Sequence, residues 1–248
     1  MARVFCIEAG VLRIAYRVFF GTHTQYAIRS MQGQILARRL NPQNVRDYTS
    51  MEPAFIIVLA TRNPGKVAEI RALLADVPVQ LLAAADIEGA PDVDEDAPTL
   101  EGNASKKARV LHVHTGLPAL ADDTGLEVDA LGGRPGVHSA RYAGPAATDA
   151  ANRARLRRDL AGASGRAAQF RTVVAFAEAG TVRYFEGVCK GHILDEERGA
   201  GGFGYDELFV PEGESRTFAE LTPAEKNALS HRGHALREFV AYLRERFS

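Results

Sequence analysis

The junction at residues 54–66, AFIIVLATRNPGK, constrains the fold of this chain more than any other stretch. Residues 54–60 form a short, continuous apolar run with β-branched side chains, which predicts a buried strand. Asn63 then suits a helix N-cap and Pro64 the first helical position, and apolar residues recur at helical spacing over residues 67–74. A buried strand that leads directly into a helix is typical of an α/β sheet.

The alternation of strand and helix continues along the chain. The next predicted elements are a strand over residues 79–84, an acidic loop over 90–102, a helix over 103–114 and a strand over 117–121 that ends at two aspartates. They are followed by a helix over residues 148–160 and by two strands within 168–191 that turn at Ala179–Gly180. A glycine-rich loop with a short strand then covers residues 199–213. The last predicted elements are a short helix from Thr222 and a long C-terminal helix, whose apolar stripe is Leu236, Phe239, Val240 and Leu243. This order predicts an α/β fold with a mixed central β-sheet flanked by helices and two lobes around a cleft.

Composition narrows the class of protein. Across 248 residues, 46% are hydrophobic and 25% charged, and the net charge of -1 gives no support to bulk affinity for nucleic acid or membranes. No apolar run approaches the roughly 20 residues that span a bilayer. Cys6 and Cys189 lie far apart, so neither a disulfide framework nor a zinc cluster is indicated, and a reducing cytoplasm is the expected location.

Residues 1–50 differ from the rest of the chain. They contain seven Arg, no Lys, and only Glu8 and Asp47 as acids. Arg-rich, acid-poor leaders occur as organelle transit peptides, and a basic apolar start occurs in signal peptides, although no compact apolar region with a clear cleavage site is present here. The favoured interpretation is that translation begins at Met51. Residues 1–50 would then be an extension outside the fold, and residues 51–248 the functional domain.

The segment from Thr61 to Lys66 is a candidate phosphate site. Free backbone N–H groups and the positive end of the helix dipole meet there, and Lys66 adds a charge within the first turn. Thr61 and Asn63 add short hydrogen-bonding side chains. The alternative is an ordinary capped helix, because the segment lacks the P-loop pattern.

Asp122 and Asp123 are adjacent carboxylates, an arrangement that is unfavourable unless a positive group neutralises it. One alternative is that Asp123 caps a short helix. Since ligands bind at the carboxyl ends of strands in an open α/β sheet, both aspartates and the Thr61–Lys66 segment are expected to face one crevice. This combination fits a polyphosphate with Mg²⁺, for which Asp94 and Glu95 of the acidic loop are further candidate ligands.

Two later segments carry groups suited to a nucleobase. Phe203 lies between glycines, where it would stack on a base or pack under a neighbouring strand. Lys226, His231 and Arg232 place three donors within seven positions, with Ser230 positioned to cap the final helix. The alternative for the donors is a solvated helix start.

Four segments, LATRNPGK, ADDTGLEVDALGGRPGVHSARYAG, GGFGYDELFVPEG and ELTPAEKNALSHRGHAL, resemble the motifs of the inosine triphosphate pyrophosphatase family, in order from Phe55 to Phe247. The resemblance implies an Mg²⁺-dependent homodimer that hydrolyses dITP, ITP and XTP to the monophosphate and pyrophosphate. It covers nearly all of the chain after Met51. Alternatives are a non-catalytic nucleotide-binding module and a pyrophosphatase for modified pyrimidine nucleotides.

The resemblance also implies roles for individual residues. Asp123 matches the catalytic carboxylate and a metal ligand, and Glu95 matches the second metal ligand, with Asp94 as the alternative. The matched substrate-binding positions are Thr61, Arg62, Asn63, Pro64, Gly65 and Lys66 for the triphosphate, Thr124 beside the aspartates, Phe203, Gly204, Tyr205 and Asp206 at the base, and Lys226, His231 and Arg232 at the purine and its phosphates. The chain departs from the usual motif at Glu207, where proline is usual, and at His138, where tyrosine is usual and where the dimer surface would change.

Base selection follows from hydrogen-bond chemistry. Hypoxanthine and xanthine present a 6-oxo acceptor where adenine presents a 6-amino donor. Donors such as Lys226 or Arg232 facing that edge would leave adenine unpaired, at about 1–3 kcal/mol per buried group. Rejection of guanine needs a second feature that the sequence does not identify.

Overall fold

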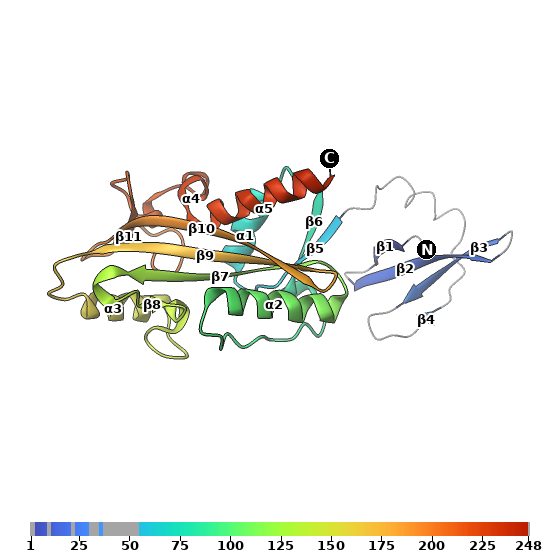
Figure 1. The fold of residues 1–248 in the computed structure, drawn as a ribbon, viewed down its shortest axis with the longest axis horizontal. Helices are drawn as coiled ribbons and strands as arrows, with labels where there is room; N and C mark the ends of the chain where they lie inside the picture. The colour runs from blue at the N-terminus through green and yellow to red at the C-terminus, as the bar shows by residue number, and fades with distance from the viewer. Residues whose placement is uncertain (1–2, 9–10, 21–22, 30–34, 37–54, 248) are drawn as a thin grey trace.

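The computed structural model describes residues 3–8, 11–20, 23–29, 35–36 and 55–247. Its main sheet has seven strands in the order β11-β10-β9-β7-β5-β6, with β8 paired to β7 (Figure 1). The strands are β5 (Phe55–Leu59), β6 (Val79–Ala83), β7 (Ala119–Val128), β8 (Pro135–Gly136), β9 (Ala167–Glu178), β10 (Thr181–Ile193) and β11 (Phe209–Pro211). The helices are α1 (Pro64–Leu73), α2 (Leu100–Thr115), α3 (Asp149–Asp159), α4 (Pro223–Leu229) and α5 (His231–Phe247).

The sheet is mixed, as predicted. Strand β5 runs parallel to both β6 and β7, whereas β7, β9, β10 and β11 pair antiparallel in turn. The parallel part is the product of the strand–helix–strand alternation, and the antiparallel part comes from the β9–β10 hairpin, which turns at the predicted Ala179–Gly180. The prediction of an α/β fold with a mixed central sheet is confirmed.

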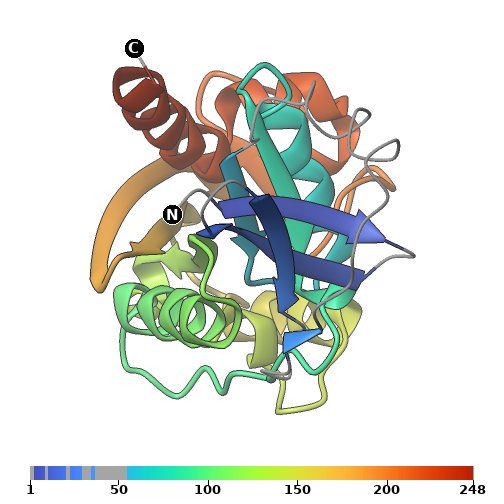
Figure 2. The same cartoon turned by 90° about the vertical axis from the view of Figure 1, so that its right-hand side faces the viewer.

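Helices cover both faces of the sheet, and the alternation of side chains along each strand supplies both cores. Ile56 and Val58 of β5 pack with Ala104, Ala108 and Leu111 of α2 on one face. The intervening β5 residues pack on the other face with α1 and α5, whose predicted stripe of Leu236, Phe239, Val240 and Leu243 is buried there. Figure 2 shows α2 on the opposite side of the sheet from α5.

A third apolar cluster forms the second lobe. It joins the far end of β7 to α3, to β9 and to the segment around β11, through residues such as Leu126, Leu156, Phe170, Phe209 and Phe218. The two lobes are therefore held together by β7 and β9, which run through both.

Local capping signals set the helix starts. The Asn63 side chain accepts hydrogen bonds from the N–H groups of Gly65 and Lys66, as predicted for an N-cap. Thr222 caps α4 in the same way. Helix α2 begins at Leu100, three residues before the predicted start, because the Thr99 hydroxyl accepts the Gly102 N–H.

The prediction that a strand ends at Asp122 and Asp123 is wrong. Strand β7 continues through both to Val128, because β9 pairs with it along its whole length. Its pairing with β5, however, stops at Leu120. The two aspartates therefore lie in mid-strand, immediately beyond the carboxyl end of the parallel part of the sheet. Nor does Asp123 cap a short helix, since the next one begins at Asp129.

One glycine decides how closely α5 approaches the sheet. A Cβ on Gly187 of β10 would lie 1.9 Å from the carbonyl oxygen of His231 and 2.6 Å from the backbone nitrogen of Ala235. Only a residue without a side chain allows this contact. Gly187 thus brings the first turn of α5, with His231 and Arg232, onto β10.

The N-terminal strands β1 (Arg3–Glu8), β2 (Val11–Phe20), β3 (His23–Arg29) and β4 (Ile35–Leu36) form a separate four-stranded sheet in that order. The prediction that residues 1–50 are an extension outside the fold falls partly on residues outside the described ranges, and it stays a prediction. Across the described ranges, no helix combines the length and apolar character needed to cross a bilayer.

Candidate active site

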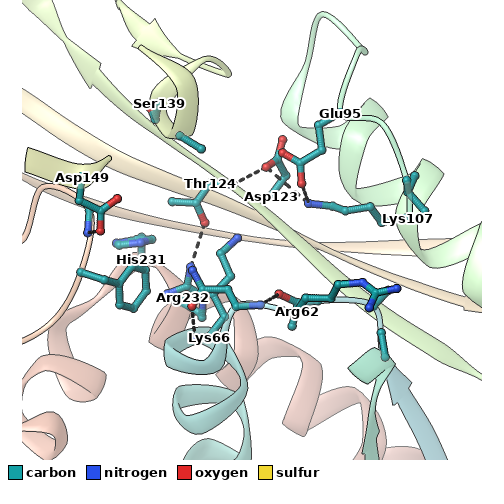
Figure 3. Close-up of a pocket in the computed structure, with 18 of the residues that line it drawn as sticks. Arg62, Lys66, Glu95, Lys107, Asp123, Thr124, Ser139, Asp149, His231 and Arg232 are labelled. Atoms are coloured by element: carbon teal, nitrogen blue, oxygen red, sulfur yellow. Dashed lines mark hydrogen bonds and ion pairs between the residues drawn. The ribbon is translucent and has the colours of Figure 1, made fainter. Parts of the chain in front are cut away.

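A cleft of about 370 Å³ opens between the two lobes, next to the middle of β7 (Figure 3). It collects residues from every motif singled out in the sequence. The candidate residues that line it are Thr61, Arg62, Asn63, Lys66, Glu95, Asp123, Thr124, Phe203, Gly204, Tyr205, Asp206, Lys226, His231 and Arg232. Pro64 and Gly65 do not line it; they form the first turn of α1 beneath the cleft residues.

Asp122 and Asp123 point to opposite sides of β7, as successive strand residues do. Asp122 faces α1 and α5: its Oδ2 lies 3.1 Å from Lys66 Nζ and accepts a hydrogen bond from Arg232 Nε at 3.0 Å. Burial alone would raise the pKa of Asp122, but Lys66, Arg232 and Lys107 outweigh it and lower the pKa below its ordinary value. Asp122 is therefore a permanently charged carboxylate that orients two cations.

Asp123 faces α2 and the cleft. Its Oδ2 accepts a hydrogen bond from Asn103 Nδ2 at 3.0 Å, and its Oδ1 lies 3.7 Å from Lys107 Nζ. Burial, and to a lesser extent the Glu95 carboxylate, raise the pKa of Asp123 against the opposing pull of Lys107. A carboxylate with a raised pKa is a better proton acceptor than an ordinary one. The two adjacent aspartates are thus neutralised on opposite sides of the strand, Asp122 by Lys66 and Arg232 and Asp123 by Lys107.

Glu95 shares its cation with Asp123. Lys107 Nζ lies 2.6 Å from Glu95 Oε1, so one ammonium group contacts both carboxylates. The Arg141 side chain donates to the backbone carbonyl of Glu95 at 2.7 Å and holds the acidic loop at the cleft. Of the two alternatives for a second ligand, Glu95 lines the cleft and Asp94 is exposed outside it.

Lys66 is the cation of the phosphate segment. Its side chain is 17% exposed and lies at the cleft beside Asp122. Burial lowers its pKa, although Asp122 opposes that shift. Arg62 is directed differently from Lys66: it donates to the Ala90 carbonyl and pairs with Asp92, so it ties this segment to the acidic loop.

Phe203 meets the phosphate segment directly. A Cβ on Gly65 would lie 2.8 Å from the Phe203 ring, so the absence of a side chain there provides the space for the ring. Lys226 Nζ lies 4.6 Å from the ring centroid, within range of a cation–π contact. The ring is half-buried rather than tucked into the core.

Lys226 and Arg232 are joined through one carboxylate, Glu69 of α1. Lys226 Nζ donates to Glu69 at 2.8 Å and to Asp206 at 2.7 Å. Arg232 donates to Glu69 and, at 3.2 Å, to the Thr124 hydroxyl, in addition to Asp122. Each cation has donors left after these contacts. Arg232 therefore links the Asp122 side of the cleft to the Lys226 side.

His231 is a neutral donor or acceptor at the cleft. Burial, together with Arg232 and Lys226, holds its pKa well below the ordinary value of 6.5. Its ring stacks on Phe170 with centroids 4.6 Å apart, and its Nδ1 has no hydrogen-bond partner among the described residues. Ser230 caps α5 as predicted, accepting the Gly233 N–H at 3.0 Å.

Several residues of this site were not predicted from the sequence: Glu69, Asn103, Lys107, Ser139 and Asp149. Asn103 and Lys107 are four residues apart on the buried face of α2. Two polar residues at helical spacing beside the apolar stripe of this helix could have indicated a role in the site. Glu69 lies one turn after Lys66 and carried no comparable signal.

Comparisons with known proteins find relatives that match most of this chain. The chain is similar to the dITP/XTP pyrophosphatase of Geobacter sulfurreducens, at 52% identity over 183 residues, which cover 73% of this chain and 92% of that protein. Its fold is similar to a HAM1 protein from Coxiella burnetii, with a TM-score of 0.72, 43% identity, and coverage of 77% of this chain and 99% of that one.

A second solved structure is the nucleoside-triphosphatase / dITP/XTP pyrophosphatase of Mycobacterium abscessus, with a TM-score of 0.62, 44% identity, and coverage of 74% of this chain and 98% of that one. The model of the Ham1 family matches residues 57–242, which include every cleft residue described above. The chain belongs to the Ham1 family.

Proposed function

We propose that this chain hydrolyses the non-standard purine nucleoside triphosphates dITP, ITP and XTP to the monophosphate and pyrophosphate. The observation that carries the proposal is the position of Asp123, a buried carboxylate with a raised pKa, in one cleft with Lys66 and the start of α1. The names of relatives at about half identity support the same activity.

In the proposed reaction, Asp123 accepts the proton of a water that attacks the α-phosphorus, and its hydrogen bond from Asn103 fixes the carboxylate while it does so. Lys66 and the positive end of the α1 dipole neutralise charge on the departing pyrophosphate. Thr124, whose N–H is bonded to Asp123 Oδ1 at 3.1 Å, holds that carboxylate from the other side. Positioning and electrostatics dominate such reactions.

The donor set suits Mg²⁺. Glu95 and Asp123 are two oxygen ligands already arranged around one cation, the Lys107 ammonium. Among the described residues, no group of three or more His, Cys, Asp or Glu forms a complete metal cage. Mg²⁺ prefers this situation, with one or two carboxylates and the remaining positions taken by substrate phosphates and water. When bound, the ion supplies Lewis-acid polarisation of the phosphate.

We assign residues 203–206, the base loop, to the purine. Phe203 would stack on the base, and the one spare donor of Lys226 would meet its polar edge, with His231 beside it in the cleft lining. Donors at the 6-position favour a 6-oxo base over adenine. The enzyme is further proposed to work in the cytoplasm as a homodimer.

The test is pyrophosphate release over a panel of ITP, dITP, XTP, GTP, ATP and dUTP with Mg²⁺. We expect the 6-oxo substrates to be turned over much faster than ATP. Asp123→Asn is expected to lower this turnover at least about a hundredfold, because the amide keeps the shape of the side chain but cannot accept the proton. Asp94→Asn, a change of the same type outside the cleft, is the matched control. Binding of ITP without turnover would identify a nucleotide-binding module instead.

A further inference from the structure

Two side chains of helix α3 bind the backbone of Gly204 in the base loop, one at its N–H group and one at its carbonyl oxygen. Asp149 Oδ2 accepts a hydrogen bond from the Gly204 N–H at 2.7 Å (Figure 3). Arg153 Nη1 donates to the Gly204 carbonyl oxygen at 3.0 Å. Asp149 and Arg153 are four residues apart, so they lie on the same side of α3. Gly204 directly follows Phe203, and its position therefore determines where the Phe203 ring enters the cleft.

Arg153 is itself anchored on two carboxylates. Its Nη2 lies 2.9 Å from Glu207 Oε2 and 3.1 Å from Glu197 Oε2, and the residue is buried. Glu207 stands directly after the base loop, and Glu197 lies between β10 and the glycine-rich segment. One guanidinium thus joins α3 to three points of a single chain segment. A buried arginine with two carboxylate partners is held in one geometry, because a misplaced charge would be left unpaired.

The Phe203 end of the loop is held less directly. The Phe203 N–H donates to Asp206 Oδ2 at 2.9 Å, a bond within the loop itself. The Phe203 ring contacts Gly65 and the Lys226 ammonium, and both contacts would be lost if the loop moved away from the cleft. The bonds from α3 fix Gly204, the residue next to Phe203, whereas Tyr205 and Asp206 are held separately, by the bond from Tyr205 Oη to the Ser139 carbonyl oxygen and by the bond from Lys226 to Asp206.

We propose that Arg153, together with Asp149 and Glu207, is a positioning residue for base recognition: it holds the base loop so that Phe203 faces the purine. The inference rests on the proposed role of the base loop. Arg153 is not among the residues that line the cleft, so its loss is expected to weaken substrate binding through the base and to leave the chemical step intact.

The loop position can be measured without any substrate. The chain contains no tryptophan, so Phe203→Trp places a single indole in the base loop. Acrylamide quenching of this indole is compared in the Phe203→Trp protein, in the same protein with Arg153→Leu, and in the same protein with Arg158→Leu, an exposed arginine of α3. We expect Arg153→Leu to raise the quenching constant about twofold or more and Arg158→Leu to leave it unchanged.

Kinetics then separate positioning from simple loss of structure. In the chain with Phe203 intact, Arg153→Leu is expected to raise KM for ITP about tenfold with kcat within about threefold. For ribose 5-triphosphate, which lacks a base, KM stays at the wild-type value. Restoring the charge with Arg153→Lys recovers part of the loss.

Two results would overturn the proposal: an unchanged quenching constant, or an equal loss for ITP and ribose 5-triphosphate. If the Arg153→Leu protein does not fold because Glu197 and Glu207 are left without their cation, the triple variant Arg153→Leu, Glu197→Gln, Glu207→Pro, which removes both carboxylates, is measured in its place. Failure of the proposed base loop has a different signature, since Phe203→Ala would then leave KM for ITP unchanged while the quenching difference persists.

Discussion

At the scale of single residues, two cations of the cleft, Lys66 and Lys226, belong to groups of charges with different carboxylate partners. Lys66 pairs with Asp122 beside the start of α1, whereas Lys226 pairs with Glu69 and Asp206 beside the Phe203 ring. Arg232 contacts both groups through Asp122 and Glu69. The structure thus changes one expectation: Arg232 is not a clean probe of base reading, because removing it also leaves Asp122 with one cation fewer.

Lys66 and Lys226 are the better pair for separating phosphate from base. We expect Lys66→Ala to lower kcat/KM for every nucleoside triphosphate alike, about ten- to a hundredfold, because all substrates carry the same phosphates. Lys226→Met is expected to narrow the ratio of kcat/KM between ITP and ATP. Lys106→Ala, on the exposed side of α2, serves as the control. An altered base ratio in Lys66→Ala would contradict this division of the cleft.

His231 makes stability depend on pH. Its folded-state pKa lies below 6.5, so below that pH the unfolded chain binds a proton that the folded chain does not. Above about pH 6.5 the protonation of His231 does not affect the free energy of unfolding. As the pH falls below 6.5, the free energy of unfolding decreases by up to about 1.4 kcal/mol per pH unit. In denaturant unfolding between pH 7.5 and 5, we expect His231→Gln to lose less stability than wild type. Parallel curves for the two proteins would show that His231 titrates normally.

At the scale of elements, the contact between β10 and α5 places two cleft residues at once. Gly187→Ala would push a Cβ into the backbone of α5, and overpacking of this kind costs about 1–3 kcal/mol or more. We expect a lowered melting temperature together with reduced kcat/KM, because Arg232 moves away from Asp122. Gly165→Ala meets no atom within 4 Å and is the matched control. Full activity in Gly187→Ala would mean that α5 can shift without disturbing the cleft.

At the scale of the whole molecule, every residue that lines the cleft belongs to the part of the chain that forms the seven-stranded sheet, its helices and the loops between them. Strands β1–β4 pair only with each other in the described ranges, and the match to the Ham1 family begins at residue 57. We therefore expect a chain of residues 51–248 to retain the melting temperature and the kcat/KM of the full chain. A melting temperature lower by many degrees would make the N-terminal residues part of the fold.

The sequence by itself determined the elements whose signals are local. The N-cap Asn63, the turn at Ala179–Gly180 and the stripe of α5 each depend on residues a few positions apart, and all are found where predicted. The sequence also predicted that the Thr61–Lys66 segment and the aspartate pair face one crevice, because strand ends in an α/β sheet share an edge, and Lys66 and Asp123 both line the cleft.

Only the tertiary structure decided what depends on pairing between distant segments. The continuation of β7 through Asp122 and Asp123 required β9 beside it, and the alternation of that strand then sent the two aspartates to different helices. The roles of Glu69 and Arg153 arose in the same way, since their partners lie 163 and 51 residues away along the chain. A charge's partner is set by distance in space, and spacing along the sequence carries that information only within a single helix or strand.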